Sequence, residues 1–125
     1  MKEDVRQWIT KAMEDYRIAE HELGFPEDEI TTGPVCFHCQ QVVEKLLKAF
    51  LITQKLDFGK THDLEYLVKL CSEIDASFKT LDIGTLTSYA VDVRYPDDFY
   101  IPSIDEARIC FEIATKAKEF ILKKI

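Results

Sequence analysis

The sequence predicts an all-α protein, an up-and-down antiparallel bundle of about five helices that forms one domain over residues 1–125. Three observations predict this fold class. Apolar residues recur at steps of three and four along four long segments, which is the spacing of one face of an α-helix. No segment has the pattern of a convincing strand. The connections between the segments are short, which favours antiparallel neighbours.

The first two helices have clear boundaries in the sequence. An apolar stripe predicts a helix over Lys2–Leu23. The Gly-Phe-Pro sequence that follows ends it, because proline cannot continue a helix. After an acidic loop, the second helix is predicted over Pro34–Lys55, since a proline in the first helical turn loses no hydrogen bond.

A third, shorter helix is predicted to cross the bundle rather than to run along it. It begins near Thr61, which suits an N-cap, and Asp63 in the first turn favours the helix start. Its apolar side extends to Cys71. Beyond this helix, three apolar residues are predicted to pack under a loop: Phe78, Leu81 and Ile83.

The last two predicted helices complete the bundle. One covers Thr85–Tyr95 and is ended by Pro96. The other covers Ile104–Lys124, and Ser103 and Glu106 at its start form a capping-box pattern. Together with the first two helices, these are the expected main members of the bundle.

The chain is acidic, with a net charge of −7 and a pI of about 4.9. This charge argues against bulk binding to nucleic acid, whose affinity comes mainly from Lys and Arg at phosphates, although a local basic pocket stays compatible with it. No apolar run approaches the roughly 20 residues that cross a bilayer. The polar, acidic start of the chain is unlike a secretory signal. We therefore expect a cytoplasmic protein with no membrane association.

A Cys-x-x-Cys sequence, Cys36 to Cys39, admits a metal or a redox interpretation. Structural zinc commonly uses two such pairs on turns, whereas this single pair lies inside a predicted helix. A redox pair would follow a strand, and none is predicted. We therefore expect no metal site and interpret the cysteines as reduced core residues. The other residues available to a metal site are His21, His38, His62, Cys71 and Cys110.

Polar residues of the second and third helices are weaker candidates for chemistry. His62 followed by Asp63 resembles an acid/base pair. A histidine beside an N-cap, with an aspartate that stabilises the helix start, explains both residues more simply. A Cys–His–Asp nucleophile cannot be assembled from this sequence. On the second helix the polar or boundary positions are Gln40, Gln41, Glu44, Lys45 and Lys48. The first four of them fit a solvated or subunit-facing surface.

The most suggestive polar cluster follows the fourth predicted helix. Its members are Arg94, Tyr95, Asp97, Asp98 and Tyr100. An arginine at a helix C-terminus is stabilised by the helix dipole, which is one account of the cluster. The same residues also suit a nucleotide, because arginine binds phosphate with two parallel hydrogen bonds and tyrosine stacks on bases. The residues alone leave both accounts open.

With these motifs in place, the chain resembles the HEPN domain family, the "higher eukaryotes and prokaryotes nucleotide-binding" proteins. The resemblance extends over nearly the whole chain, and its motifs occur in the order typical of the family. The residues that carry it are Trp8 and Ala12, the run Cys36–Lys45, the sequence His62-Asp63-Leu64, and the sequence Arg94-Tyr95-Pro96-Asp97.

The resemblance implies a helical bundle that forms a homodimer and a function related to nucleotides or RNA. For a small stand-alone member it also implies a minimal nucleotidyltransferase as partner, in a toxin–antitoxin-like pair. Many family members are metal-independent ribonucleases whose motif is an arginine and, a few residues later, a histidine. Arg94 matches the arginine, but no histidine follows it in the chain. Tyr100 is a poor acid/base substitute for that histidine.

The leading hypothesis is therefore a nucleotide-binding protein, not an enzyme, that partners a nucleotidyltransferase. Arg94 would contact phosphate, Tyr95 or Tyr100 would stack, and Asp97 and Asp98 would shape the pocket of an ATP-like ligand. One alternative is a ribonuclease toxin that uses Arg94 without the motif histidine. A second alternative is a bundle that only binds other proteins. Secondary site candidates are Gln40, Gln41, Glu44, Lys45 and His62.

Overall fold

The chain is all-α in a computed structural model that describes residues 2–90 and 100–125. Within these two ranges there is no strand, and four α-helices form a bundle, so the predicted fold class is confirmed. The elements in order are α1 (Glu3–Leu23), the 3-10 turn η1 (Glu27–Glu29), α2 (Thr32–Thr53), α3 (Leu64–Ile74), the 3-10 segments η2 (Ala76–Thr80) and η3 (Leu86–Tyr89), and α4 (Ile104–Leu122).

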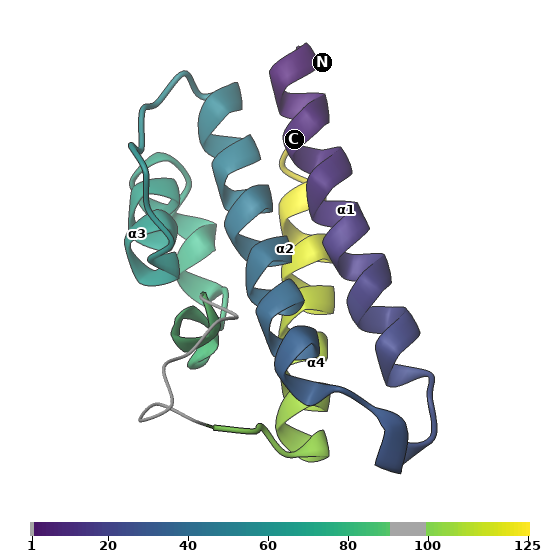
Figure 1. The fold of residues 1–125 in the computed structure, drawn as a ribbon. Coiled ribbons are helices and arrows are strands. Elements are labelled where there is room, and N and C mark those ends of the chain that lie inside the picture. Colours follow the sequence, from purple (N-terminus) through teal and green to yellow (C-terminus); the bar gives the residue numbers. More distant parts are fainter. Residues whose placement is uncertain (1, 91–99) are drawn as a thin grey trace.

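Helix α2 is the central element of the bundle. Helix α1 runs antiparallel to it on one side, and α3 packs against its other side (Figure 1). Helix α4 also packs against α2 but runs in the same direction, because the chain has already returned through α3 and the two 3-10 segments. Helix α1 is therefore antiparallel to both α2 and α4, and both chain ends lie at the same end of the bundle.

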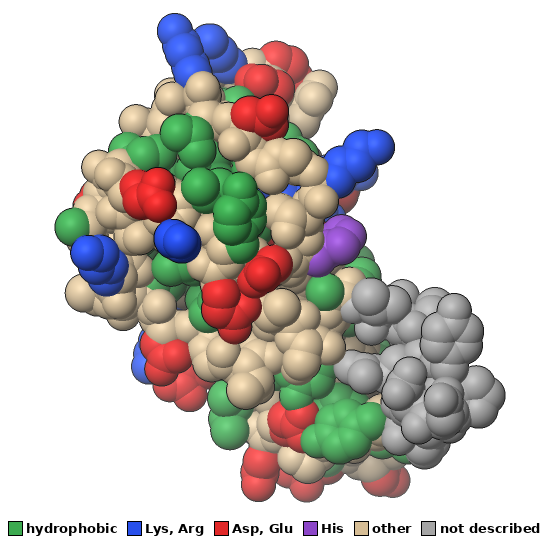
Figure 2. Space-filling model, turned by 90° about the vertical axis from the view of Figure 1, so that its left-hand side faces the viewer, with side chains coloured by type: hydrophobic (Ala, Val, Ile, Leu, Met, Phe, Trp, Pro, Cys, Tyr) green, Lys and Arg blue, Asp and Glu red, His purple; other side chains and the backbone are tan. Residues whose placement is uncertain are grey.

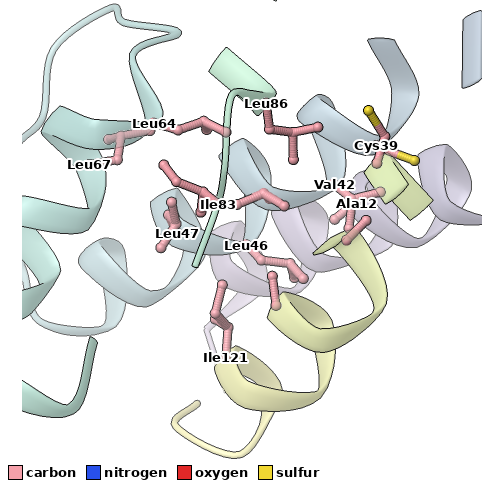
Figure 3. Close-up of a cluster of buried hydrophobic side chains, with 14 of the residues drawn as sticks. Ala12, Cys39, Val42, Leu46, Leu47, Leu64, Leu67, Ile83, Leu86 and Ile121 are labelled. Atoms are coloured by element: carbon pink, nitrogen blue, oxygen red, sulfur yellow. The ribbon is translucent and has the colours of Figure 1, made fainter. Parts of the chain in front are cut away.

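The core forms around α2 because each of the other helices turns one apolar stripe toward it. Leu46 and Leu47 of α2 are fully buried. Figure 3 shows them among side chains of the three surrounding helices, including Ala12, Leu67 and Ile121. This cluster holds α2 in place and fixes which of its side chains face the interior.

Both ends of α2 differ slightly from the prediction. The helix begins at Thr32, and Pro34 lies in its first turn as expected. Lys55, predicted as its last residue, already lies beyond the helix with a φ of 57°. The N–H of Leu56 donates to the carbonyl of Leu51 at 3.0 Å, which closes the helix end around this left-handed residue.

The N-cap of α3 is Asp63 and not Thr61, so the predicted start was wrong by two residues. The Asp63 carboxylate accepts a hydrogen bond from the N–H of Tyr66 at 3.2 Å, which is the bond an N-cap makes. Thr61 instead accepts from the N–H of Asp63 at 3.1 Å and orders the chain ahead of the helix. The helix is the short member of the bundle that the sequence predicts.

Residue Phe78 is part of the core, although a position under a loop was expected. It belongs to η2 and is completely buried. Its ring centroid lies 4.7 Å from that of Phe50 on α2 and 5.1 Å from that of Phe120 on α4. Ile83 is also buried, and Leu81 is partly buried against the same cluster. The segment between α3 and α4 therefore contributes to the core.

The fourth predicted helix, Thr85–Tyr95, is described only at its start. Leu86–Tyr89 form the 3-10 segment η3 and not an α-helix, although Leu86 and Tyr89 are buried as predicted. The remainder of that helix, 91–95, lies outside the described residues. Helix α4 begins at Ile104 after the predicted cap, where the Ser103 hydroxyl accepts from the N–H of Glu106 at 3.0 Å.

Candidate functional site

Helix α2 carries polar side chains into the protein interior, which the sequence did not predict. Gln40 is completely buried, and Glu44 and Lys48 are exposed by only 3% and 6%. These residues follow one another at steps of four, so they form one stripe of the helix. The interpretation of its first two members as part of a solvated or subunit-facing surface was wrong, because α3, the chain ahead of α3 and the aromatic rings of Trp8 and Phe58 cover the stripe.

Glu44 is the centre of a hydrogen-bonded cluster. One of its carboxylate oxygens, Oε1, accepts from Gln40 Nε2 at 3.1 Å and pairs with His62 Nδ1 at 2.9 Å. The other, Oε2, accepts from Lys48 Nζ at 3.0 Å. Gln41, which is partly buried, also donates to Glu44 Oε1, at 3.4 Å. Burial alone would raise the pKa of Glu44, but the hydrogen bonds from its partners outweigh that effect and lower it.

Lys48 is enclosed by two aromatic rings in addition to its carboxylate partner. Its Nζ atom lies 5.5 Å from the ring centroids of both Trp8 and Phe58. A cation over the faces of aromatic rings is stabilised by their quadrupoles, which reduces the cost of removing it from water. The ammonium group therefore has a fixed place, and it fixes the Glu44 carboxylate in turn.

His62 joins this cluster from the chain just before α3. Its side chain is 64% exposed while its Nδ1 atom contacts the buried Glu44. Its backbone carbonyl accepts a hydrogen bond from Gln40 Nε2 at 3.2 Å. The carboxylate partner of His62 is thus Glu44, 18 positions earlier, and not the neighbouring Asp63, which caps α3. Of the secondary candidates, the structure brings Gln40, Gln41, Glu44 and His62 together.

The remaining secondary candidate, Lys45, belongs to a second cluster between α1 and α2. Its Nζ atom donates to Asp15 Oδ2 at 2.6 Å, and His38 Nδ1 lies 2.7 Å from Asp15 Oδ1. The Asp15 carboxylate is 9% exposed and the two partner side chains are 22% exposed. Sequence reasoning missed Asp15. The available signal was its position between Ala12 and Ala19, at helical spacing on an apolar stripe.

Most of the predicted nucleotide-binding residues, namely Arg94, Tyr95, Asp97 and Asp98, lie outside the described residues. Two tyrosines that flank this segment are described, and Glu106 in the first turn of α4 binds both. The Tyr100 hydroxyl donates to Glu106 Oε1 at 2.5 Å, and the Tyr89 hydroxyl donates to Glu106 Oε2. Tyr100 is 53% exposed. The start of α4 therefore fixes the residues on either side of the Arg94 segment.

Segment η3 packs against the start of α3. Helix α3 begins two residues after His62. The Thr87 hydroxyl accepts from the N–H of Leu64 at 3.0 Å and donates to Glu65 at 2.8 Å. Figure 2 shows the α3 side of the molecule, where hydrophobic and acidic side chains lie close together and a histidine is exposed. His62 immediately precedes Asp63, the N-cap of α3, and contacts Glu44 of α2.

The four cysteines are buried free thiols, which confirms the predicted core positions. Burial raises the pKa of Cys39, and it raises the pKa of Cys71 to about 12, so both are thiols and not reactive thiolates. Among residues 2–90 and 100–125, no group of three or more His, Cys, Asp or Glu side chains is placed to hold a metal ion. In the same part of the chain, no helix is both long and apolar enough to cross a membrane.

Comparisons with known proteins agree with this architecture. The model of the HEPN domain matches residues 5–125. The crystal structure of TT1696 from Thermus thermophilus superposes with a TM-score of 0.70 at 21% identity, covering 99% of this chain and 100% of that one. The crystal structure of ST0689, an archaeal HEPN homologue, gives a TM-score of 0.67 at 21% identity, with 99% and 98% covered. At these identities the two structures support the fold alone. No curated protein matches the chain.

Proposed function

We propose that this chain, which belongs to the HEPN domain family, is a nucleotide-binding protein that works with a nucleotidyltransferase. The proposal of nucleotide binding rests on the exposure and the fixed position of the Tyr100 side chain. Its side chain is half exposed, and its hydroxyl is held by Glu106. A base can stack on such a ring, and a ring that is already fixed loses little side-chain entropy when the ligand binds.

In this proposal Arg94 binds the phosphates of the ligand, and Tyr95 supplies a second ring. Arginine presents a planar fork of donors that matches phosphate oxygens. Asp97 and Asp98 orient the guanidinium group. These four assignments rest on the order of residues in the sequence, beside the described Tyr100. The ligand class is an ATP-like nucleotide, which offers both a base and several phosphates.

Calorimetric titration with ATP tests the site. We expect Arg94→Ala to weaken binding by about tenfold or more, because a charge-assisted hydrogen bond contributes about 1.5–3 kcal/mol. Tyr100→Ala is expected to weaken it by a similar factor through lost stacking. The control is Tyr66→Ala, since Tyr66 on α3 is also exposed, by 43%, and should leave binding unchanged. A wild-type protein that binds no nucleotide, or unchanged binding by Arg94→Ala, would contradict the proposal.

The proposed protein partners are a second copy of the chain and a small nucleotidyltransferase, as in a toxin–antitoxin pair. Two large apolar side chains near the start of α4, Ile101 and Ile109, are exposed by 66% and 57%, which supports an additional contact surface. The four free thiols support a reducing compartment such as the cytoplasm. Light scattering on the protein alone and co-expressed with a minimal nucleotidyltransferase should give the masses of a dimer and of a larger complex. A monomer in both samples would refute this part.

A metal-independent ribonuclease is a second candidate function, and one observation favours it. The histidine that the ribonuclease motif places after the arginine is missing after Arg94. The fold nevertheless presents an imidazole from a different element, since His62 is exposed and held by the buried Glu44. Histidine is the side chain most often used for proton transfer near neutral pH.

A further inference from the structure

We propose that the outward side of α3 is a docking surface for a basic amphipathic helix of a partner protein. Its apolar part consists of Tyr66, Leu70 and Ile74, which follow one another at steps of four and so lie on one side of the helix. Lys69 and Glu73 flank them, and we call the five residues the α3 face. This inference goes beyond the proposed nucleotide site and does not rest on it.

Helix α3 carries apolar residues on two sides, and only one side packs fully into the bundle. The completely buried residues of the helix are Leu64, Leu67 and Cys71. On the α3 face, Tyr66 and Ile74 are 43% and 39% exposed, and Leu70 between them is only partly buried. A helix on the surface of a bundle needs one apolar stripe, toward the core. The second set of apolar residues is therefore surface that a contact with another molecule would bury.

The charged residues of α3 and its two ends are mostly acidic. From Asp63 to Asp75 there are four acidic residues and one basic residue, Lys69. Asp75 is paired with Lys124 at 2.9 Å, so outside that pair three acidic residues stand against one basic residue. Figure 2 shows hydrophobic side chains gathered on the α3 side of the molecule, with acidic side chains at their edge. A partner that covers the apolar residues therefore meets negative charge beside them, which favours lysine and arginine on the partner.

Glu73 is the acidic residue that is best placed to bind a cation of the partner. It lies three positions after Leu70, so the two residues are neighbours on the helix surface. The other acids at the start of the helix have internal roles, since Asp63 caps α3 and Glu65 accepts a hydrogen bond from Thr87. Glu73 is exposed and has no hydrogen-bond or ion-pair partner among residues 2–90 and 100–125. Its carboxylate can therefore pair with a lysine or arginine without breaking a contact of the fold.

The spacing of the α3 face fits a helix as the partner. Its three apolar residues span about two helical turns, and a second helix can place an apolar stripe of its own along them. A second copy of the chain fits this face less well. A twofold contact through the α3 face would place its acidic residues opposite the same acidic residues of the other copy, and like charges across an interface repel. The structure therefore favours a helix in which lysine and arginine flank the apolar stripe.

The test measures binding of a fluorescent synthetic peptide by anisotropy. The peptide is an amphipathic helix of about five turns, with leucine on one side and lysine on the other. A second peptide carries glutamate at every lysine position. We expect the wild type to bind the lysine peptide with micromolar affinity, as is usual for a small interface. The affinity should fall as the salt concentration rises, and the glutamate peptide should not bind.

Substitutions of apolar residues locate the contact. Tyr66→Ala and Ile74→Ala should each weaken binding of the lysine peptide by about fivefold or more, because they remove apolar area from the centre of the contact. The control is Phe25→Ala, since Phe25 is 53% exposed outside α3 and its loss should leave binding unchanged. Circular dichroism checks that the variants are folded.

Substitutions of charged residues separate a local contact from the overall charge of the protein. Glu73→Lys should weaken binding of the lysine peptide by about threefold or more, because it replaces an attraction beside the apolar stripe by a repulsion. Glu119→Lys is the matched control. It makes the same change of net charge at an exposed residue of α4 and should change the affinity little.

Three results with the peptides would overturn the proposal: no binding of the lysine peptide by the wild type, wild-type affinity in both Tyr66→Ala and Ile74→Ala, or equal losses in Glu73→Lys and Glu119→Lys. Light scattering supplies a fourth. A wild-type dimer that Tyr66→Ala converts to a monomer would assign the α3 face to a second copy of the chain. The ATP titration involves none of these residues, so this proposal and the nucleotide site fail independently.

Discussion

Replacing Glu44 with leucine is expected to reduce the free energy of unfolding by about 3–5 kcal/mol. The carboxylate is 4% exposed and is the hydrogen-bond acceptor for Lys48, whose own side chain is 7% exposed. Leucine fills similar space but accepts no hydrogen bond, so the ammonium group would remain buried without a counter-charge. A loss of this size is a large part of the roughly 5–15 kcal/mol that stabilises a typical domain. Urea unfolding of Glu44→Leu and wild type measures it.

Two further variants distinguish the effect of leaving Lys48 buried without a counter-charge from the effect of losing an ion pair. Glu112 and Lys116 on α4 form another pair at the same i,i+4 spacing, with side chains 63% and 71% exposed. Glu112→Leu should change stability little, because water solvates the lysine that remains. The double variant Glu44→Leu/Lys48→Met should recover much of the loss, since it removes the orphaned charge and keeps an apolar chain between the aromatic rings. A Glu44→Leu variant as stable as wild type would refute the argument.

The same cluster has a predictable dependence on pH. Because the pKa of Glu44 is lowered from its usual value of 4.5, the folded protein binds this proton more weakly than the unfolded chain does. Its contribution to stability is therefore complete above about pH 4.5 and is lost as the pH falls through the lower value of the folded state. The stability of Glu44→Leu should fall less steeply than that of wild type over this acid range.

The sequence predicts the fold better than it predicts this cluster, for a physical reason. Periodicity along α2 identifies the apolar face that carries Leu46 and Leu47, since that face repeats within the helix. The polar stripe is also periodic, but its burial depends on residues that are remote in the sequence. His62 arrives from before α3, and Trp8 and Phe58 close over Lys48. No local pattern reports such contacts.

Tertiary contacts also account for the elements that the sequence misplaces. The pattern from Thr85 onward suits a helix, yet the described part of it is the short η3 segment. There Thr87 binds the first N–H of α3, and Tyr89 binds Glu106 at the start of α4. These bonds fix the segment between two helices in a conformation that helix propensity does not determine.

Replacing Phe78 with alanine is the second change with a large expected effect. Its ring is completely buried and contacts Phe50 of α2 at a tilt of 46° and Phe120 of α4 edge-on at 89°. Alanine would leave a cavity between η2 and these two helices and would remove both ring contacts. Deletions of this kind cost about 3–5 kcal/mol, because the surrounding helices relax only partly.

Thermal or urea unfolding of Phe78→Ala measures this loss, and two further variants serve as controls. Phe25→Ala removes a phenylalanine that is 53% exposed, so it should have little effect. Phe78→Leu keeps most of the buried volume and should cost much less than alanine. If the three variants were equally stable, η2 would not be part of the core. The expected order instead makes Phe78 the residue through which the segment between α3 and α4 holds α2 against α4, so its loss should also weaken any site built on α2.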